Sequence, residues 1–362
     1  MKDRKKPAIR FKGFTEDWEQ CKLGKICSVL MCHRIFKEQT SETGDIPFYK
    51  IGTFGAEPDA FISRELFEEY KSKYPYPQKG DILISASGSI GRTLEFTGDS
   101  EYFQDSNIVW LNHDERLSNL FLKCFYSVVK WDGIEGSTIK RLYNDNILKT
   151  VICMPSVSEQ EYVGIFFENL DNLITLHQCK CNYLLRLKDC IFSFIVKTTW
   201  EQRKLGEVVD VCSGRDYKHL SEGDIPVYGT GGYMLSVNQA LSYDEDAIGI
   251  GRKGTIDKPY VLKSPFWTVD TLFYAVPRDK IALNFAFDIF QNIDWKKKDE
   301  STGVPSLSKT AINEIDVLIP KYEEQHALGQ FFNDIDNLIT LHQRKLEKLK
   351  NIKKSCLEKM FI

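Results

Sequence analysis

The chain has 362 residues, of which 42% are hydrophobic, 27% charged and 12% aromatic, a composition that excludes a disordered or fibrous protein. At about 150 residues per domain, this length predicts two domains. The net charge of −3 gives no general attraction to nucleic acid, but only the charge of a contact face decides phosphate binding.

The sequence also limits where the protein is found. No apolar run approaches the roughly 18 residues of a membrane-spanning helix, and the basic N-terminus lacks the apolar stretch of a secretory signal. We therefore expect a cytoplasmic protein that does not enter a membrane. Its ten cysteines should be reduced thiols, because the chain is long and shows no export signal. The closest pair, Cys179 and Cys181, also lacks the C-x-x-C spacing of a zinc or redox site.

In the first half, short apolar runs bounded by Gly, Asp and Asn predict buried strands at 81–85 and 107–111, followed by a helix at 120–131. Pro155 then stops a further strand. Ser158-Glu159-Gln160-Glu161 has the form of a capping box, in which a hydroxyl and a carboxylate satisfy free N–H groups at a helix start. A helix of about 35 to 40 residues is predicted from this point.

The second half repeats the first. The heptapeptide that starts at Trp18 returns at 200–206 with six identities, and the octapeptide 171–178 returns unchanged at 336–343. The offset falls from 182 to 165 residues, so the first copy carries 17 more residues, which we place in loops around Lys50 to Gly80. The second copy should therefore contain the same elements: strands at 246–249 and 271–276, a helix at 285–295 and a long helix after Pro320.

Each long helix carries one apolar stripe with steps of three or four residues, which predicts packing against a partner helix. The stripe of the first copy is Phe166, Leu170, Leu173, His177, Cys181, Leu184, Leu187 and Ile191. The stripe of the second copy is Phe331, Ile335, Leu338, His342, Leu346, Leu349, Ile352, Cys356 and Met360. For His177 and His342, which are equivalent, a hydrogen-bonded position in the seam is favoured over metal binding.

Two copies of one unit tend to pack about a pseudo-two-fold axis. We therefore expect an α+β protein with two tandem globular domains separated by a pair of long antiparallel helices, a coiled coil. The expected domain boundaries are 1–155 for the first globular domain, 156–198 for the first long helix, 199–320 for the second globular domain and 321–362 for the second long helix.

Motifs of nucleotide-dependent catalysis are missing. The segment 249–254 matches G-x-G-x-x-G, but Pro259 follows where the dinucleotide motif requires a helix. There is no P-loop and no Asn/Asp-Pro-Pro-aromatic tetrapeptide of the kind that amino-methyltransferases use. Because no His, Cys and carboxylate cluster has metal-ligand or nucleophile spacing either, we expect a chain that is not an enzyme and holds no cofactor or metal.

Four loops are candidates for DNA contact: 87–92 and 136–141 in the first copy, and 249–255 and 303–309 in the second. Flexible backbone beyond a strand can approach a polyanion, and an arginine there can reach a guanine edge. The candidate residues are Ser87, Ser89, Arg92, Lys140, Arg141, Arg252, Lys253, Thr255 and Lys309. For each loop, the alternative interpretation is an ordinary turn or strand cap.

Several motifs resemble those of the specificity subunits of type I restriction-modification systems. They are the segment 7–14 followed by Trp18-Glu19-Gln20 and Leu23-Gly24, the Gly-Asp-Ile-Pro at 44–47 and 223–226, and the Glu-Gln, Phe-Phe and Asp-Asn-Leu-Ile sequences of both long helices. The resemblance spans nearly the whole chain. It implies that each globular domain is a target-recognition domain for one half of a split site in double-stranded DNA. It also implies that the helices act as a spacer and dock two modification subunits, with restriction subunits as a further class of partner.

The same resemblance implies that methyl transfer and cleavage belong to partner subunits, so S-adenosylmethionine is expected in the modification subunit. The two helices are much more alike than the globular domains, which suits identical partners and different half-sites. Six identical polar residues off the stripe are the candidate partner contacts: Asn172, Thr175, Gln178, Asn337, Thr340 and Gln343. Recent duplication alone would leave the same identity. A coiled-coil adaptor that binds only protein and a single-chain methyltransferase or nuclease remain as alternatives.

Overall fold

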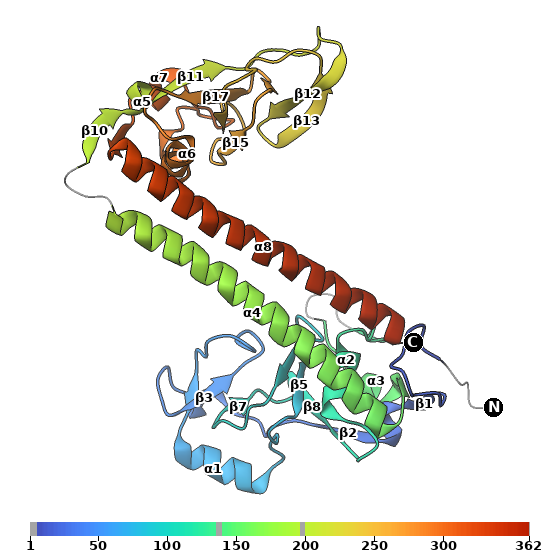
Figure 1. Ribbon diagram of the computed structural model, residues 1–362. Helices are drawn as coiled ribbons and strands as arrows, with labels where there is room; N and C mark the ends of the chain where they lie inside the picture. Colours follow the sequence, from blue (N-terminus) through green and yellow to red (C-terminus); the bar gives the residue numbers. More distant parts are fainter. Residues whose placement is uncertain (1–5, 135–139, 196–199, 362) are drawn as a thin grey trace. The chain divides into compact units, whose positions relative to one another are not determined.

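The computed structural model describes residues 6–134, 140–195 and 200–361, and it divides into two compact units. The first unit comprises residues 1–176 and 345–362, and the second comprises residues 177–344. Each unit has a globular part of strands and short helices, and each includes part of two 39-residue helices, α4 (Val157–Ile195) and α8 (Tyr322–Met360) (Figure 1). The α+β class, the repeat and the length of the helices are therefore confirmed.

The first unit contains two sheets and one strand pair. The four-stranded sheet is β2 (Cys27–Leu30), β8 (Ile108–His113), β5 (Ile82–Ser85) and β6 (Thr93–Glu95), all antiparallel. The three-stranded sheet is β4 (Phe61–Ile62), β3 (Ile46–Tyr49) and β7 (Tyr102–Phe103), with β7 parallel to β3. The strand pair is β1 (Glu19–Lys22) with β9 (Val151–Met154). The two strands predicted here are confirmed as β5 and β8.

The second unit repeats this topology. Its four-stranded sheet is β11 (Val209–Ser213), β17 (Leu272–Pro277), β14 (Ala247–Gly251) and β15 (Tyr260–Leu262). Its three-stranded sheet is β13 (Gly232–Val237), β12 (Glu222–Gly229) and β16 (Trp267–Thr268), again with one parallel pair. Its strand pair is β10 (Glu201–Lys204) with β18 (Asp316–Ile319). The strands predicted at 246–249 and 271–276 are β14 and β17.

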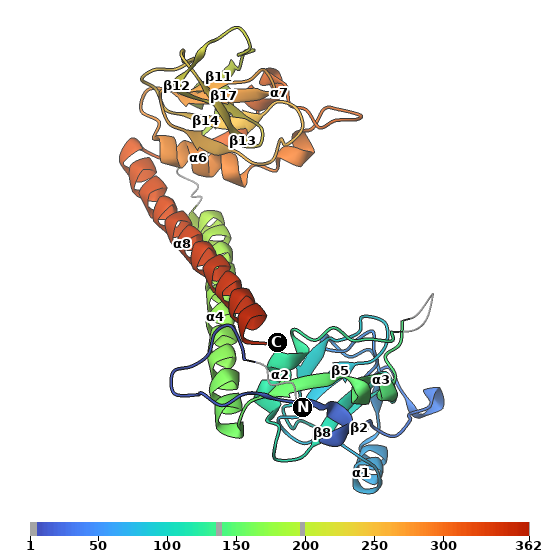
Figure 2. The ribbon, with the colours of Figure 1, turned by 90° about the vertical axis from the view of Figure 1, so that its right-hand side faces the viewer.

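Strand β5 and the first four residues of β8 are buried on both faces of the sheet, so they consist almost entirely of apolar residues. In β5, Ile82 and Ile84 enter one core with α2, while Leu83 points to the opposite face and enters a second core. The alternation follows from the two-residue period of a strand. In the second unit, α6 packs against one face of the four-stranded sheet in the same way (Figure 2).

Short helices complete each unit. The first unit has α1 (Arg64–Lys73), α2 (Asn119–Tyr126), α3 (Asn144–Lys149) and the 3₁₀ turns η1 (Leu23–Lys25) and η2 (Lys37–Gln39). The second has α5 (Leu205–Val208), α6 (Leu283–Asn292), α7 (Lys309–Asn313) and η3 (Trp295–Lys298). The helices predicted at 120–131 and 285–295 are α2 and α6, which both end earlier than expected.

The extra residues of the first copy are not all in loops, which corrects the prediction from the sequence. They include helix α1, which has no counterpart in the second unit. The Ser63 hydroxyl caps this helix by accepting a hydrogen bond of 3.2 Å from the Leu66 N–H, and Phe67 is completely buried in the second core. A helix forms because one buried aromatic anchor and one N-cap are enough to fix a charged segment on a core.

The long helices are anchored to their globular parts in the same way in both copies. The buried Gln160 side chain accepts from the Ser118 N–H and donates to the Pro155 carbonyl, and Gln325 makes the equivalent bonds with Ala282 and Pro320. Gly164 and Gly329 allow close packing, because an added Cβ would lie 2.4 Å from the Leu120 side chain or 2.7 Å from the Phe285 nitrogen.

The predicted capping box of α4 is wrong by two residues. The helix begins at Val157, and the Ser156 hydroxyl accepts from the Glu159 N–H at 3.4 Å, so Ser158 is not the cap. Glu159, not Glu161, has a defined partner: both of its carboxylate oxygens accept from the Arg10 guanidinium at 2.6 Å. Glu159 is fully buried, and this distant partner could not be seen in local sequence.

The predicted stripes hold in part. Within each unit α4 and α8 pack side by side, but Leu173, Phe331, Leu338 and Ile352 are exposed. The seam is occupied instead by residues that directly follow predicted stripe positions: Phe167, Ile174, Lys188, Phe332, Ile339 and Lys353. The predicted buried face of each helix is therefore rotated by about one residue, or about 100°, from the face that forms the seam. The apolar residues of each helix cover too broad a face to distinguish the two orientations.

His177 and His342 meet in the second unit, with 2.8 Å between their Nδ1 atoms. One ring nitrogen donates and the other accepts, so the predicted hydrogen-bonded position in the seam is confirmed. The pair joins equivalent positions of the two copies, as expected where a repeat packs against itself.

Candidate nucleic-acid interface

The glycine loop of the second unit is built as a tight turn that ends strand β14. Gly251 has no room for a side chain, because a Cβ there would lie 1.9 Å from the Thr255 carbonyl oxygen. Gly254 has a φ of +90°, which favours glycine. The turn leads into β15 and not into a helix, so the geometry of a dinucleotide-binding loop is not formed.

The fold brings the two predicted loops of this unit together. Lys253 and Ser306 form an antiparallel bridge, and the Gly254 N–H donates to the Pro305 carbonyl at 2.9 Å. A groove of about 320 Å³ lies between the loops, and its lining includes Arg252, Lys253 and Lys309. Residues more than 50 positions apart in sequence thus form one basic surface.

The three cations of this groove are held to different degrees. Arg252 Nη1 lies 3.5 Å from the Asp270 carbonyl, and its guanidinium carbon lies 5.7 Å from the centre of the Phe273 ring. Lys309 Nζ lies 4.0 Å from Asp210 Oδ1. Lys253 is exposed and has no ion pair with the described residues. Stacking of Arg252 on an aromatic ring orients its fork of donors without neutralising it.

The first unit has the same bridge with different residues. Ser87 pairs with Arg141, and the Gly88 N–H donates to the Lys140 carbonyl at 3.0 Å. Lys140 and Arg141 are exposed, as is Ser89. The predicted loop residues 136–139 lie outside the described residues.

Two predicted DNA contacts of the first unit also have hydrogen-bond partners within the protein. Ser87 is only 3% exposed, and its hydroxyl donates to Asn107 Oδ1 at 2.7 Å. The Arg92 guanidinium donates to the carbonyls of Ile51 at 2.6 Å and Phe54 at 3.2 Å, which fixes the loop from within. Burial therefore makes Ser87 a weaker candidate for DNA contact, whereas Arg92 is exposed and stays a predicted contact that also fixes this loop.

Backbone hydrogen bonds define which positions of the two bridges correspond. The Leu142 N–H donates to the Ala86 carbonyl, and the Leu307 N–H donates to the Arg252 carbonyl. Arg252 and Lys253 therefore occupy the places of Ala86 and Ser87. The basic pair lies on the strand-end loop in the second unit, and on the opposite loop, at Lys140 and Arg141, in the first. Thr255 is half-buried behind the turn, and its contribution is limited accordingly.

The long helices carry a second candidate surface. The six polar residues predicted to contact a partner are all exposed: Asn172, Thr175, Gln178, Asn337, Thr340 and Gln343. Sequence reasoning missed the leucines beside them, because it assigned Leu173 and Leu338 to the buried stripe. Leu173 and Leu176 are 44% and 46% exposed, and Leu338 and Leu341 are 46% and 45% exposed. The two copies thus present matching polar and apolar groups.

Among residues 6–134, 140–195 and 200–361, no three His, Cys, Asp or Glu side chains lie where they could share a metal ion. None of the helices in this described part is both long and apolar enough to cross a membrane.

Comparison with known proteins points to one family. The profile of the type I restriction modification DNA specificity domain matches residues 15–186 and 197–351. A Haemophilus influenzae protein described as a type I restriction enzyme specificity subunit is 60% identical over 157 residues, which span 42% of this chain and 41% of that relative. The type I restriction enzyme MjaVIII specificity subunit of Methanocaldococcus jannaschii is 23% identical over 330 residues, or 76% of this chain and 74% of its own.

Solved structures agree on the fold. The crystal structure of a type I restriction-modification S subunit from M. genitalium has a TM-score of 0.73 and covers 99% of both chains at 17% sequence identity. At this level of identity the likeness establishes the fold but does not assign the residues that contact DNA.

Proposed function

The chain belongs to the family of type I restriction-modification DNA specificity subunits, and from this premise we propose that it recognises a two-part site in double-stranded DNA. The globular domains 1–155 and 199–320 act as target-recognition domains for one half-site each. The helices 156–198 and 321–362 act as spacer and docking surface.

One observation carries the proposal of two different half-sites. Both units form the same backbone bridge between two loops, but the basic residues lie on opposite sides of it, at Arg252 and Lys253 in one unit and at Lys140 and Arg141 in the other. An arginine or lysine specifies guanine by its position in the major groove. Equivalent frameworks with displaced cations therefore suit different base sequences.

The helix surfaces support docking of two identical modification subunits. Within the shared octapeptide the exposed residues are the same in both copies, including Asn172 and Asn337 with the leucines that follow them. Exposed leucines beside amide side chains provide the apolar centre and polar rim typical of a protein interface. We propose that these partners hold S-adenosylmethionine and the catalytic residues, that this chain performs no catalysis, and that the complex acts in the cytoplasm.

Sequencing of methylated sites in cells that express this chain with its modification subunit tests the proposal. Changing Arg252 and Lys253 to Ala should relax or weaken only one half of the methylated sequence, by about 1–3 kcal/mol per lost base contact. The matched control is Lys263→Ala with Lys321→Ala, at exposed positions outside the groove. An equal loss on all sequences would make the two residues phosphate contacts. A chain whose DNA affinity does not fall with salt would support the adaptor instead.

A further inference from the structure

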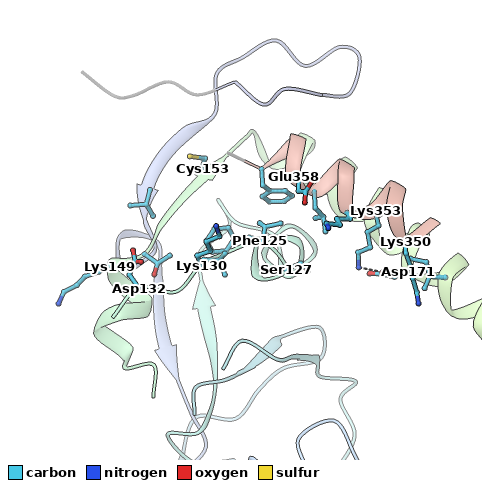
Figure 3. Close-up of a pocket in the computed structure, with 18 residues that line it drawn as sticks. Phe125, Ser127, Lys130, Asp132, Lys149, Cys153, Asp171, Lys350, Lys353 and Glu358 are labelled. Atoms are coloured by element: carbon cyan, nitrogen blue, oxygen red, sulfur yellow. Dashed lines mark hydrogen bonds and ion pairs between the residues drawn. The ribbon is translucent and has the colours of Figure 1, made fainter. Parts of the chain in front are cut away.

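A cavity in the first unit has no role in the function proposed above. It has a volume of about 1100 Å³ and lies between the end of α2, strand β9 and the last turns of α8 (Figure 3). Apolar side chains from these elements line it, including Phe125, Leu357 and Phe361. Small-molecule sites occupy about 300–1000 Å³, so the cavity is large enough for a ligand of that class.

Lysines surround this apolar lining. Lys130, Lys350 and Lys354 line the cavity and form no ion pair or side-chain hydrogen bond with the described residues. Lys149 is exposed, and its nearest carboxylate oxygen, on Asp145, is 3.9 Å away. Lys353 differs, because Asp171 neutralises it. The cavity therefore combines an apolar lining with several uncompensated positive charges, which suits an anion with an apolar body.

Two carboxylates give the site a further requirement. Asp132 and Glu358 also line the cavity and form no ion pair with any residue of the described ranges. Figure 3 shows Glu358 on α8 and Asp132 beyond the end of α2. An ionised carboxylate only accepts hydrogen bonds, so a ligand that satisfies these groups must carry O–H or N–H donors as well as negative charge.

The repeat provides an internal comparison for the charges. Equivalent positions can be assigned because Trp131 corresponds to Trp295 and Pro155 to Pro320. The shared octapeptide aligns the sequences of the two long helices in the same way. The equivalent positions of Lys130, Lys149, Lys350 and Lys354 are occupied in the second unit by Asp294, Glu314, Leu185 and Asp189. The basic character thus belongs to the first unit alone, and any task that the two copies share does not need it.

We propose that the cavity binds a nucleotide. A base would pack on Phe125 and the neighbouring aliphatic side chains, the phosphate groups would meet Lys130, Lys350 and Lys354, and ribose hydroxyls or an exocyclic amine would donate to Asp132 or Glu358. Lysine binds phosphate as a mobile point charge, so no fixed fork of donors is needed. A DNA duplex presents its phosphates on a convex surface and keeps its bases stacked, so it cannot fill the apolar lining.

Isothermal titration calorimetry of the full chain with AMP, ADP and ATP tests this site, with adenosine and inorganic phosphate as separate probes. At least one nucleotide should bind at one site per chain and more tightly than either part. The variant Lys350→Leu with Lys354→Asp, which installs the residues found at the equivalent positions of the second unit, should weaken nucleotide binding at least about tenfold, since two charged contacts are lost. The control is Lys348→Leu with Lys359→Asp, which makes the same charge change at exposed positions outside the cavity.

No saturable nucleotide binding, or equal binding by the cavity variant and the control, would overturn the proposal. So would weaker binding of a non-specific DNA duplex by the cavity variant without any nucleotide binding, because the lysines would then be DNA phosphate contacts. Thermal unfolding checks that each variant folds, and Lys130→Ala, at an exposed position beyond α2, serves as a second cavity variant. Half-site recognition is measured separately, so failure of this site leaves the proposed DNA function standing.

Discussion

The Lys188 ammonium lies 2.7 Å from Asp336 Oδ2 in the second unit, and the repeat pairs Lys353 with Asp171 in the first. In each pair the lysine comes from one copy and the aspartate from the other. This exchange of roles is the pattern of an isologous contact. It explains how a lysine can occupy a helix seam in which the apolar pattern predicted leucine and isoleucine.

The two ion pairs have different surroundings. Asp288 of α6 places a second carboxylate 3.8 Å from Lys188, and its Oδ2 atom is buried without a hydrogen bond in the described part of the chain. The equivalent residue of α2 is Cys124, whose pKa is raised to about 12 by burial, so that position stays neutral. The second unit therefore has a buried acid at a position where the first unit has a neutral cysteine.

The acid at 288 should make stability depend on pH. Burial raises the pKa of Asp288 to about 8 despite the opposing attraction of Lys188, with a smaller contribution from the repulsion of the nearby Asp336 carboxylate. Between about pH 4 and pH 8, the folded chain holds a proton that the unfolded chain has lost. The free energy of unfolding should therefore fall as pH rises through this window, by up to about 1.4 kcal/mol per pH unit from this group.

Denaturant unfolding of the full chain between pH 4 and 9 measures how the free energy of unfolding changes with pH. Asp288→Asn removes the titrating group and should flatten the curve, while the control Asp334→Asn, at an exposed position of α8, should leave it unchanged. An unaltered slope in Asp288→Asn would mean that another group holds the proton.

The two lysines of the seam should differ in their effect on stability. Lys188→Met leaves the Asp336 carboxylate without its cation, beside the buried Asp288, at a site where the lysine is only 11% exposed, and should cost about 3 kcal/mol. Lys353→Met should cost about 1 kcal/mol, because this lysine is 26% exposed, against 11% for Lys188, so its pair with Asp171 is more accessible to water. Local hydrogen exchange in α4 and α8 compares the two variants, and equal losses would contradict this account.

The first target-recognition domain should depend on the opposite loop from the second. Lys140→Ala with Arg141→Ala should alter only the half-site that Arg252→Ala with Lys253→Ala leaves intact, because the cations occupy opposite sides of the shared bridge. Selection of bound sequences from a randomised duplex measures both halves at once. Changes in the same half from both variants would show that the two units do not divide the site.

Partner docking should depend on the exposed leucines. Leu338→Glu with Leu341→Glu should remove one modification subunit from the complex, and the further changes Leu173→Glu and Leu176→Glu should remove the other, because charge is costly in an apolar contact. Native mass spectrometry counts the subunits. Asn333→Glu with Asn351→Glu adds equal charge at exposed positions of α8 and is the control. Full assembly of the fourfold leucine variant would place docking elsewhere.

The sequence by itself determined the repeat, the class of fold and most elements, because these depend on local periodicity. The strands around Ile84 and Val109 and the two long helices were all predicted from apolar spacing. The octapeptide that contains His177 and His342 fixed which positions correspond. Signals within a few residues of one another were sufficient for these conclusions.

Only the tertiary structure decided what depends on distant partners. A broad apolar stripe could not say whether Leu173 or Ile174 faces the other helix, and lysine at 188 was acceptable in the seam only because Asp336 neutralises it. In the same way, the sequence presents Ser87 as a candidate DNA contact, but the fold buries this residue and its hydroxyl donates to Asn107. Burial and pairing across the fold, with partners that lie far away in sequence, assign such polar groups to stability or to recognition.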